Sequence, residues 1–319
     1  MKKIQQFEPN LGEEEKKELL SVIDSGWYTE SKKTREFENN FANFVGRKYA
    51  VATTSGTVAL CIAIQGLGLK KEDEVVIPDL TFVASPNSVI LAGSKVSLVD
   101  IQKDNLCLDI EKTKQNVSDK TKAIMPVDFN GRAPNLISLK EFAEKSGLFI
   151  IEDSCHGIGS FYGGKHTGCY SDVGIFSFST PKIITTGQGG MLVTDNKELY
   201  EKFRMIKDFG RDVDKKHQME NAFDHVEMGY NFKFTEFQAA VGIAQMKKLP
   251  HRIEHNKKMF QLYRENLSSI PEIEFVDLDL KTTVPWFVDI LLPNEKIRQG
   301  LVEHLKQSGI GTRKFYPPI

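Results

Sequence analysis

The feature that most constrains the fold is a regular alternation of short apolar runs and helical patterns between Ala50 and Asp153. The apolar runs have the length of strands, and each is separated from the next by a stretch with helical spacing. The expected strands are residues 50–53, 74–78, 96–100, 122–127 and 148–153, and the helices between them are 56–67, 81–92, 105–114 and 136–146. Strands that alternate with helices predict an α/β fold, a mostly parallel sheet with helices on both faces.

The flanking segments follow other patterns. Two amphipathic helices, 11–24 and 34–45, precede the alternation. After it we expect strands at 173–178 and 190–194, a helix at 197–207, a long polar surface loop at 209–228, and helices at 235–249 and 250–267. In the C-terminal part of the chain we expect strands at 274–276 and 283–292, a helix at 294–308 and a strand at 312–315. We therefore predict a large domain of residues 1–249 and a small α+β domain of residues 250–319.

Charge and composition exclude several classes of protein. The chain has 42 basic and 43 acidic residues, so no global field draws it to nucleic acid or to a membrane surface. Its four cysteines lack paired spacing, and its seven histidines form no HExxH motif, so we expect neither a disulfide scaffold nor a metal site. We expect His251 and His255 to face solvent. The N-terminus has no apolar signal region and no run has membrane-spanning length, which predicts a cytoplasmic protein.

Two residues with complementary chemistry stand out. Asp153 ends the apolar strand LFIIED, and the carboxyl ends of parallel strands are where ligands bind. Lys182 lies further along, between an aromatic strand and a Gly-rich turn. Taken alone, Asp153 could be a helix N-cap and Lys182 a solvated surface residue. Together, an acid and a lysine are what a pyridoxal phosphate site needs, because the lysine forms the Schiff base and the carboxylate keeps the pyridinium nitrogen protonated.

A phosphate-binding segment is also expected. Thr54, Ser55, Gly56 and Thr57 lie between a strand and a helix, where backbone N–H groups and hydroxyls can bind phosphate, although a plain N-cap is the alternative. Ser177 is a second candidate hydroxyl. Phe82, after the next strand, could stack on a flat ring or belong to the core.

Several segments together resemble the nucleotide-sugar aminotransferases, the DegT-type family of fold type I pyridoxal phosphate enzymes. The resemblance runs nearly end to end and is most specific in SDVGIFSFSTPKIITTGQGGMLVTD, with LFIIEDSCHGIG upstream and GYNFKFTEFQAAVGIAQ downstream. The sequence is most similar to the GDP-perosamine synthase branch. The family usually continues past the FYPP segment, so we expect the small domain to be incomplete.

The resemblance implies a role for each matching residue. Lys182 matches the Schiff-base lysine and Asp153 the pyridinium partner. The other cofactor contacts that it implies are Phe82 on the ring, His156 near the ring hydroxyl, and Gly56, Thr57 and Ser177 at the phosphate. Asn231 matches a residue that reaches the phosphate of the neighbouring subunit's cofactor, which implies a homodimer with shared active sites.

The implied reaction transfers an amino group from L-glutamate to a nucleotide-linked 4-keto-6-deoxy sugar, with pyridoxamine 5'-phosphate as the intermediate form of pyridoxal 5'-phosphate. Such a product serves surface polysaccharide or glycan biosynthesis. Two alternatives remain open. The first is a sugar 3-dehydratase of the same fold, although such members typically carry His at the position of Lys182. The second is a non-catalytic or regulatory homologue that binds the cofactor only.

Overall fold

A seven-stranded sheet forms the centre of the computed structural model, which describes residues 3–212 and 224–319. The strand order is β1-β9-β8-β5-β4-β2-β3. The strands are β1 (Tyr49–Thr53), β2 (Glu74–Pro78), β3 (Lys95–Val99), β4 (Thr121–Ile124), β5 (Phe149–Asp153), β8 (Val173–Ser177) and β9 (Gly190–Thr194). β8, β5, β4, β2 and β3 pair in parallel, while β9 is antiparallel to both of its neighbours. The predicted α/β architecture is confirmed.

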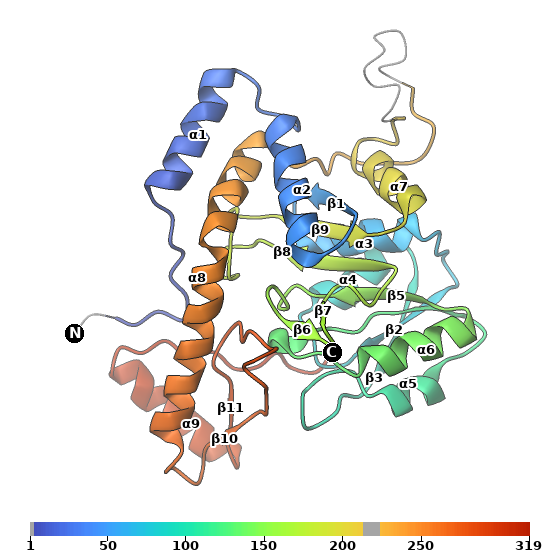
Figure 1. The fold of residues 1–319 in the computed structure, drawn as a ribbon. Coiled ribbons are helices and arrows are strands. Elements are labelled where there is room, and N and C mark those ends of the chain that lie inside the picture. Colours follow the sequence, from blue (N-terminus) through green and yellow to red (C-terminus); the bar gives the residue numbers. More distant parts are fainter. Residues whose placement is uncertain (1–2, 213–223) are drawn as a thin grey trace.

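Helices cover both faces of the sheet (Figure 1). One face is covered by α3 (Gly56–Gly66), α4 (Ala84–Leu91) and α7 (Lys197–Lys207). The other is covered by α2 (Lys32–Val45) and α8 (Glu236–Leu267) at one end and by α5 (Ile110–Asn116) and α6 (Leu136–Ser146) at the other. Val51 packs against the α3 side while Ala50 and Ala52 pack against α2 and α8. The strands are apolar throughout because both faces are buried.

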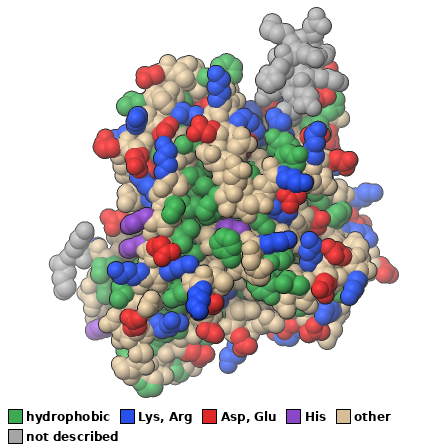
Figure 2. All heavy atoms as spheres, in the orientation of Figure 1, with side chains coloured by type: hydrophobic (Ala, Val, Ile, Leu, Met, Phe, Trp, Pro, Cys, Tyr) green, Lys and Arg blue, Asp and Glu red, His purple; other side chains and the backbone are tan. Residues whose placement is uncertain are grey.

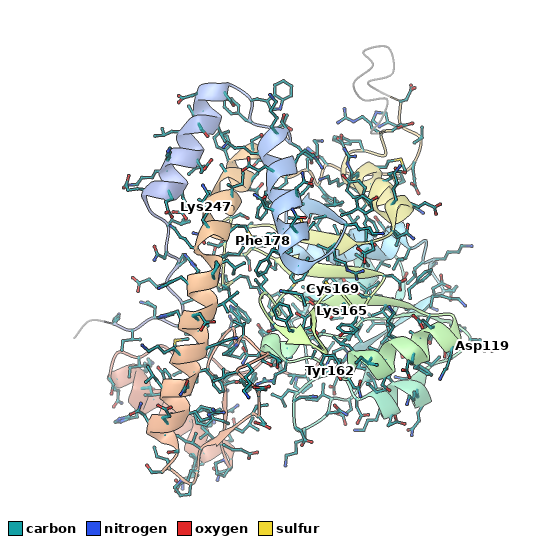
Figure 3. The ribbon with its side chains drawn as sticks, in the orientation of Figure 1. Asp119, Tyr162, Lys165, Cys169, Phe178 and Lys247 are labelled. Carbon is teal, nitrogen blue, oxygen red and sulfur yellow. The ribbon has the colours of Figure 1, made fainter. Side chains whose placement is uncertain are left out.

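Helix α2 is held on the sheet by aromatic contacts. Phe37 and Phe41 are one turn apart and therefore share a face of the helix. Their ring centroids lie 5.1 Å from Phe178 and 4.9 Å from Phe176, respectively. Phe178, labelled in Figure 3, follows β8 directly. This packing fixes the segment that leads from β8 towards Lys182.

Helix α8 corrects one prediction. The sequence predicts two helices that meet at Pro250, but one helix runs through it from Glu236 to Leu267. A proline inside a helix removes a hydrogen bond and costs about 3 kcal/mol. Tertiary contacts offset this cost, since α1 (Glu13–Ser25) packs along α8 and its buried Glu15 accepts hydrogen bonds from Gln245 and Lys248. The division of the chain into domains at residue 250 stays a prediction.

The C-terminal region is less regular than the sequence suggests. It contains the antiparallel pair β10 (Glu274–Phe275) and β11 (Ile290–Leu291), followed by α9 (Glu295–Gln307). Of the strand expected at 283–292, only residues 290–291 form a strand, β11. The strand expected at 312–315 is wrong. Residues 312–319 form neither a helix nor a strand and run instead to the carboxyl end of β2, where the Ile319 N–H donates to the Asp79 carbonyl at 2.9 Å.

Three smaller differences concern local boundaries. A short hairpin of β6 (Phe161–Tyr162) and β7 (Lys165–His166) is not predicted from the sequence. Helix α4 begins at Ala84 rather than at Thr81. Of the predicted 209–228 loop, residues 213–223 lie outside the described residues.

Charges of both signs are mixed over the face seen in Figure 2, as the balanced composition leads one to expect. Within residues 3–212 and 224–319, no helix is both long enough and apolar enough to cross a membrane.

Candidate active site

The candidate residues converge where β5, β8 and β1 meet the start of α3. β5 and β8 are neighbouring parallel strands, so their last residues, Asp153 and Ser177, lie at the same edge of the sheet. β1 leads at that edge into the N-terminus of α3 at Gly56. The carboxyl edge of the sheet therefore combines an acid, a hydroxyl and a helix N-terminus, as expected for a ligand site in an α/β fold.

Asp153 is buried, with only 5% of its surface exposed, and both of its carboxylate oxygens are engaged. Oδ2 accepts a hydrogen bond from Ser85 Oγ at 2.8 Å, and Oδ1 accepts one from the Cys155 backbone N–H at 3.2 Å. Residues 154–160 form turns rather than a helix, so the N-cap alternative for Asp153 is wrong. A buried carboxylate with so few donors is suited to a cationic partner.

Lys182 lies in the turn between β8 and β9 and is half-buried rather than fully solvated. Burial lowers the pKa of its amine to about 8, against the opposing effect of Cys155 and Asp153. Its Nζ lies 3.8 Å from the centroid of the Trp286 ring. Lys182, Cys155, His156 and Trp286 line one small, partly open pocket. The amine is thus held in a half-buried site near a carboxylate, where part of it is neutral near physiological pH.

The start of α3 forms a close-packed cradle with the ends of β8 and β5. A β carbon on Gly56 would lie 3.1 Å from both Cys155 Sγ and Ser177 Cβ. Ser55 caps the helix by accepting from the Val58 N–H at 3.2 Å, so the N-cap reading of this segment also holds. Thr57 follows on the same turn and is half-buried. The glycine at position 56 therefore lets the start of α3 approach Cys155 and Ser177 closely, and an alanine there would require one of these side chains to shift.

His156 is buried beside Lys182. Its Nδ1 accepts from the Asn130 backbone N–H at 3.4 Å, and its ring centroid lies 4.2 Å from that of Trp286. Burial, with smaller contributions from Lys182 and Arg132, lowers its pKa well below the usual value. His156 is therefore a neutral imidazole near pH 7.

Phe82 is not a core residue, because 46% of its surface is exposed. Its ring lies 5.3 Å from that of Tyr316, which belongs to the C-terminal segment. The aromatic ring is therefore exposed, and the core alternative is wrong.

Asn231 comes from a different part of the chain. It is exposed and forms a β-bridge with Asp208 in the segment before α8. The hydrogen bonds within the described residues do not link it to Lys182 or Asp153. A role in the site of another chain therefore stays a prediction.

Sequence reasoning missed three neighbours of the site, namely Ser85, Trp286 and Tyr316. Ser85 stands in the quoted segment DLTFVAS, but nothing in its spacing marks it as the partner of Asp153. Trp286 is one of only two tryptophans, which is the one signal that could have drawn attention to it. Tyr316 directly follows the segment 312–315 expected to be a strand, and nothing in its spacing marks it as a neighbour of the site.

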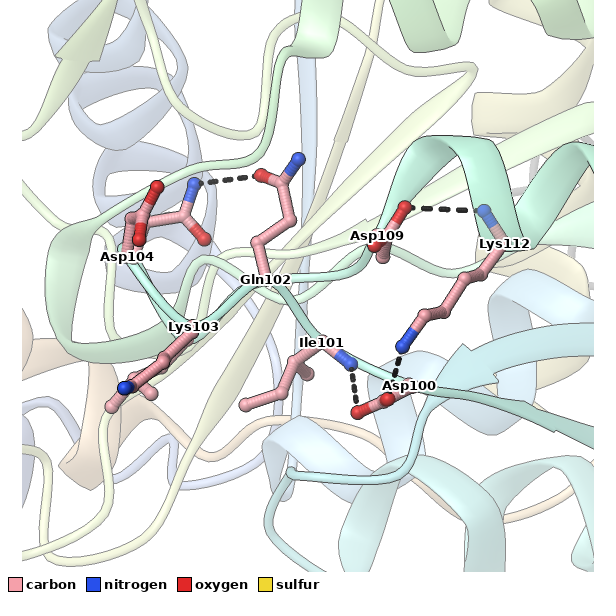
Figure 4. A pocket seen from close by; sticks show the side chains of 9 residues that line it. Asp100, Ile101, Gln102, Lys103, Asp104, Asp109 and Lys112 are labelled. Atoms are coloured by element: carbon pink, nitrogen blue, oxygen red, sulfur yellow. Dashed lines mark hydrogen bonds and ion pairs between the residues drawn. The ribbon is translucent and has the colours of Figure 1, made fainter.

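A larger cavity of about 660 Å³ lies elsewhere, after β3 (Figure 4). Its lining includes Asp100, Asp104 and Asp109, and Lys112 pairs with Asp100. In the part of the chain that the structure describes, no group of three or more His, Cys, Asp or Glu side chains is arranged to hold a metal ion.

Comparison with known proteins gives a consistent set of relatives. The profile of the DegT/DnrJ/EryC1/StrS aminotransferase family matches residues 9–319. The chain is 33% identical over 320 residues to a GDP-perosamine synthase of Escherichia coli O157:H7, covering 100% of this chain and 86% of that protein.

Two solved structures share the fold. One is PseC of Helicobacter pylori, an aminotransferase involved in the biosynthesis of pseudaminic acid, with a TM-score of 0.92 and 28% identity over 100% of this chain and 86% of that one. The other is the E. coli GDP-4-keto-6-deoxy-D-mannose-3-dehydratase with bound hydrated PLP, with a TM-score of 0.91 and 28% identity over 99% and 86%. The architecture is that of a fold type I aminotransferase.

Proposed function

The chain belongs to the DegT/DnrJ/EryC1/StrS family of pyridoxal phosphate (PLP)-dependent sugar aminotransferases, and we propose that it transfers an amino group from L-glutamate to a nucleotide-linked 4-keto-6-deoxy sugar. The observation that carries the proposal is the arrangement of half-buried Lys182 near buried Asp153, at the sheet edge where α3 begins. This arrangement provides a reactive amine, a partner for a ring cation and a phosphate-binding helix start at one sheet edge.

The residues present fit PLP. Asp153 has a buried carboxylate suited to the pyridinium nitrogen, and the cradle at Gly56 would be filled by a single β carbon. In this proposal Thr57 and Ser177 contact the phosphate with Gly56, while His156 and Phe82 contact the ring. When bound, PLP supplies the electron-accepting ring that stabilises negative charge at the substrate carbon.

Lys182 does the acid–base work in this proposal. With a pKa of about 8, about a tenth of its amine is neutral at pH 7, against well under a thousandth for an ordinary lysine. A neutral amine can accept a proton from the substrate carbon, and the ammonium form can donate a proton back. Neutral His156 stands next to it and places no second positive charge in the pocket.

The proposed sugar substrate is inferred from similarity to relatives of known name. The 33% identity to a GDP-perosamine synthase supports a GDP-linked 4-keto-6-deoxymannose as the first substrate to test. The likeness to a 3-dehydratase supports the second candidate, a pyridoxamine-dependent dehydration. The lysine at position 182 favours amino transfer, because a dehydratase typically carries His there.

One experiment separates these reactions. The protein is incubated with PLP, L-glutamate and, in turn, GDP-, UDP- and dTDP-4-keto-6-deoxy sugars, and the products are read by mass spectrometry together with 2-oxoglutarate release. Amino transfer gives a 4-amino sugar and stoichiometric 2-oxoglutarate. Loss of water from the sugar without a stable amino product supports the dehydratase. Cofactor binding without turnover of any sugar supports the non-catalytic homologue.

We further propose a homodimer in which Asn231 contacts the partner's cofactor phosphate. Asn231 is exposed in the single chain, and its neighbours Met228 and Tyr230 expose apolar surface, with Met228 exposed over 76%. Contiguous exposed apolar residues are typical of an interface. The test mixes inactive Lys182→Ala chains with inactive Asn231→Ala chains. Shared sites predict that heterodimers regain up to one intact site each, whereas no recovery despite proven subunit exchange contradicts the shared site.

A further inference from the structure

Trp286 makes two direct contacts with the loop that carries Lys182. Lys182 Nζ lies 3.8 Å from the centroid of the indole ring. The indole Nε1–H donates a hydrogen bond of 2.6 Å to the carbonyl of Pro181, the residue before Lys182. The indole ring therefore contacts this loop twice, once at its backbone and once at the Lys182 amine. Its other close neighbour is the His156 ring, at 4.2 Å between centroids.

The segment that carries Trp286 is fixed by side-chain hydrogen bonds rather than by a sheet. The Phe287 N–H donates to Asn130 Oδ1 at 2.9 Å, and Asn130 Nδ2 donates back to the Phe287 carbonyl at 3.0 Å. On the other side, Asn256 Nδ2 donates to the Pro285 carbonyl at 3.0 Å. Trp286 is thus anchored on both sides and presents its ring at a set position.

We propose that Trp286 is a positioning residue for Lys182, whose ammonium it holds against the ring face at the candidate active site. The attraction between a cation and an aromatic face acts on the ammonium and is lost when the amine becomes neutral. The same contact therefore holds the protonated lysine in place and frees the neutral amine to react. This inference rests on the role of Lys182 in the proposed function.

The effect of a change at Trp286 on the pKa of Lys182 depends on the charged and titratable groups that face this lysine. Burial lowers the pKa of the lysine, Cys155 and Asp153 raise it by less, and His156 is neutral. Trp286→Leu keeps an apolar side chain and removes the ring face, so we expect the pKa of Lys182 to fall by about half a unit to one and a half units. Trp286→Phe keeps a ring face, although a weaker one, and we expect a smaller shift.

The test measures the pKa of Lys182 directly in the full chain without cofactor. Competitive labelling with acetic anhydride across pH 6 to 11, read by mass spectrometry of the Lys182 peptide, gives the pKa. Surface Lys140 in the same digest is the internal reference. The matched control is Trp27→Phe, which alters the other tryptophan at a site exposed over 57%. The expected order of pKa is parent and Trp27→Phe highest, then Trp286→Phe, then Trp286→Leu. Equal values in the parent and in a folded Trp286→Leu protein overturn the proposal.

A second readout needs no change at position 286. In the Trp27→Phe background, Trp286 is the only tryptophan, so its fluorescence should change with pH at the pKa that labelling gives for Lys182, and Lys182→Met should abolish this change. A flat titration contradicts the contact even if the Trp286 variants do not fold. Neither readout involves PLP or substrate, so failure of the proposed function would be seen separately, as absence of cofactor capture.

Discussion

Replacement of Asp153 by Asn separates the charge of this residue from its shape. Asp153 Oδ1 accepts from the Cys155 N–H at 3.2 Å, and Oδ2 accepts from Ser85 Oγ at 2.8 Å. An asparagine keeps both contacts, because its oxygen still accepts from Cys155 and its NH₂ donates to Ser85 Oγ. The Ser85 hydroxyl can then donate to Thr81 Oγ1, which lies 2.9 Å away. We expect the free energy of unfolding to change by less than about 1 kcal/mol.

The effect on activity should be much larger. The neutral amide cannot hold the ring nitrogen of PLP protonated, and a hydrogen bond to a charged group contributes about 1.5 to 3 kcal/mol. At 1.36 kcal/mol for each factor of ten, this corresponds to a loss of about 10- to 150-fold in kcat/KM. Because the proposed phosphate contacts are untouched, the cofactor should still bind.

The assay is 2-oxoglutarate release with the keto sugar that the substrate screen identifies, alongside equilibrium dialysis of PLP. Ser85→Ala is the matched control, since it removes a neutral hydrogen bond to the same carboxylate and leaves the charge in place. It should lose less than about tenfold. If Asp153→Asn keeps more than a third of the parent kcat/KM, the carboxylate does not serve the ring nitrogen and the reasoning is refuted.

Three further outcomes follow from the structure. The pKa of Lys182 is about 8 in the folded chain, against 10.5 for an exposed lysine. Between these pH values the unfolded chain binds more protons, so the free energy of unfolding should rise with pH. Urea titrations at pH 8 and 10 should show a smaller rise in Lys182→Met than in the parent, and an equal rise in both would contradict the shift. Gly56→Ala places a β carbon 3.1 Å from Ser177 Cβ and should weaken PLP retention in dialysis, whereas Gly300→Ala, with open space around it, should not. Arg132 and Asp289 form a buried ion pair, so Arg132→Met alone should cost about 3 to 5 kcal/mol in denaturant unfolding and adding Asp289→Leu should restore most of it; a cost below about 1 kcal/mol for the single change would show that the pair is not buried in solution.

The sheet could be predicted from the sequence because each strand and helix in it has a strong local pattern. The strand LFIIED is clear from its continuous apolar run, and the helix at 197–207 from its helical spacing. Pro250 could not be interpreted correctly, because its local preference to end a helix is outweighed by the packing of α1 on α8. The segment at 283–289 reads as a strand by composition, yet its hydrogen bonds go to side chains such as Ser160 and Asn130.

For the candidate site, the sequence identifies residues at the ends of strands better than their neighbours in space. Asp153 and Ser177 end apolar strands, and parallel pairing alone brings them to one edge. Trp286 lies more than 100 residues from Lys182 in the chain, and no periodicity predicts a contact over that separation. Asn231 cannot be placed from one chain at all, since its expected partner is in a second copy.

The central claim is that Lys182 is the residue that binds PLP covalently. The most direct measurement incubates the full chain with PLP, reduces it with borohydride and maps the modified lysine by mass spectrometry of tryptic peptides, with Lys182→Ala as the control. We predict one dominant adduct at Lys182 that is absent from the control, in which folding is retained. Stoichiometric reduced cofactor on a peptide without Lys182, or its persistence in Lys182→Ala, would contradict the claim.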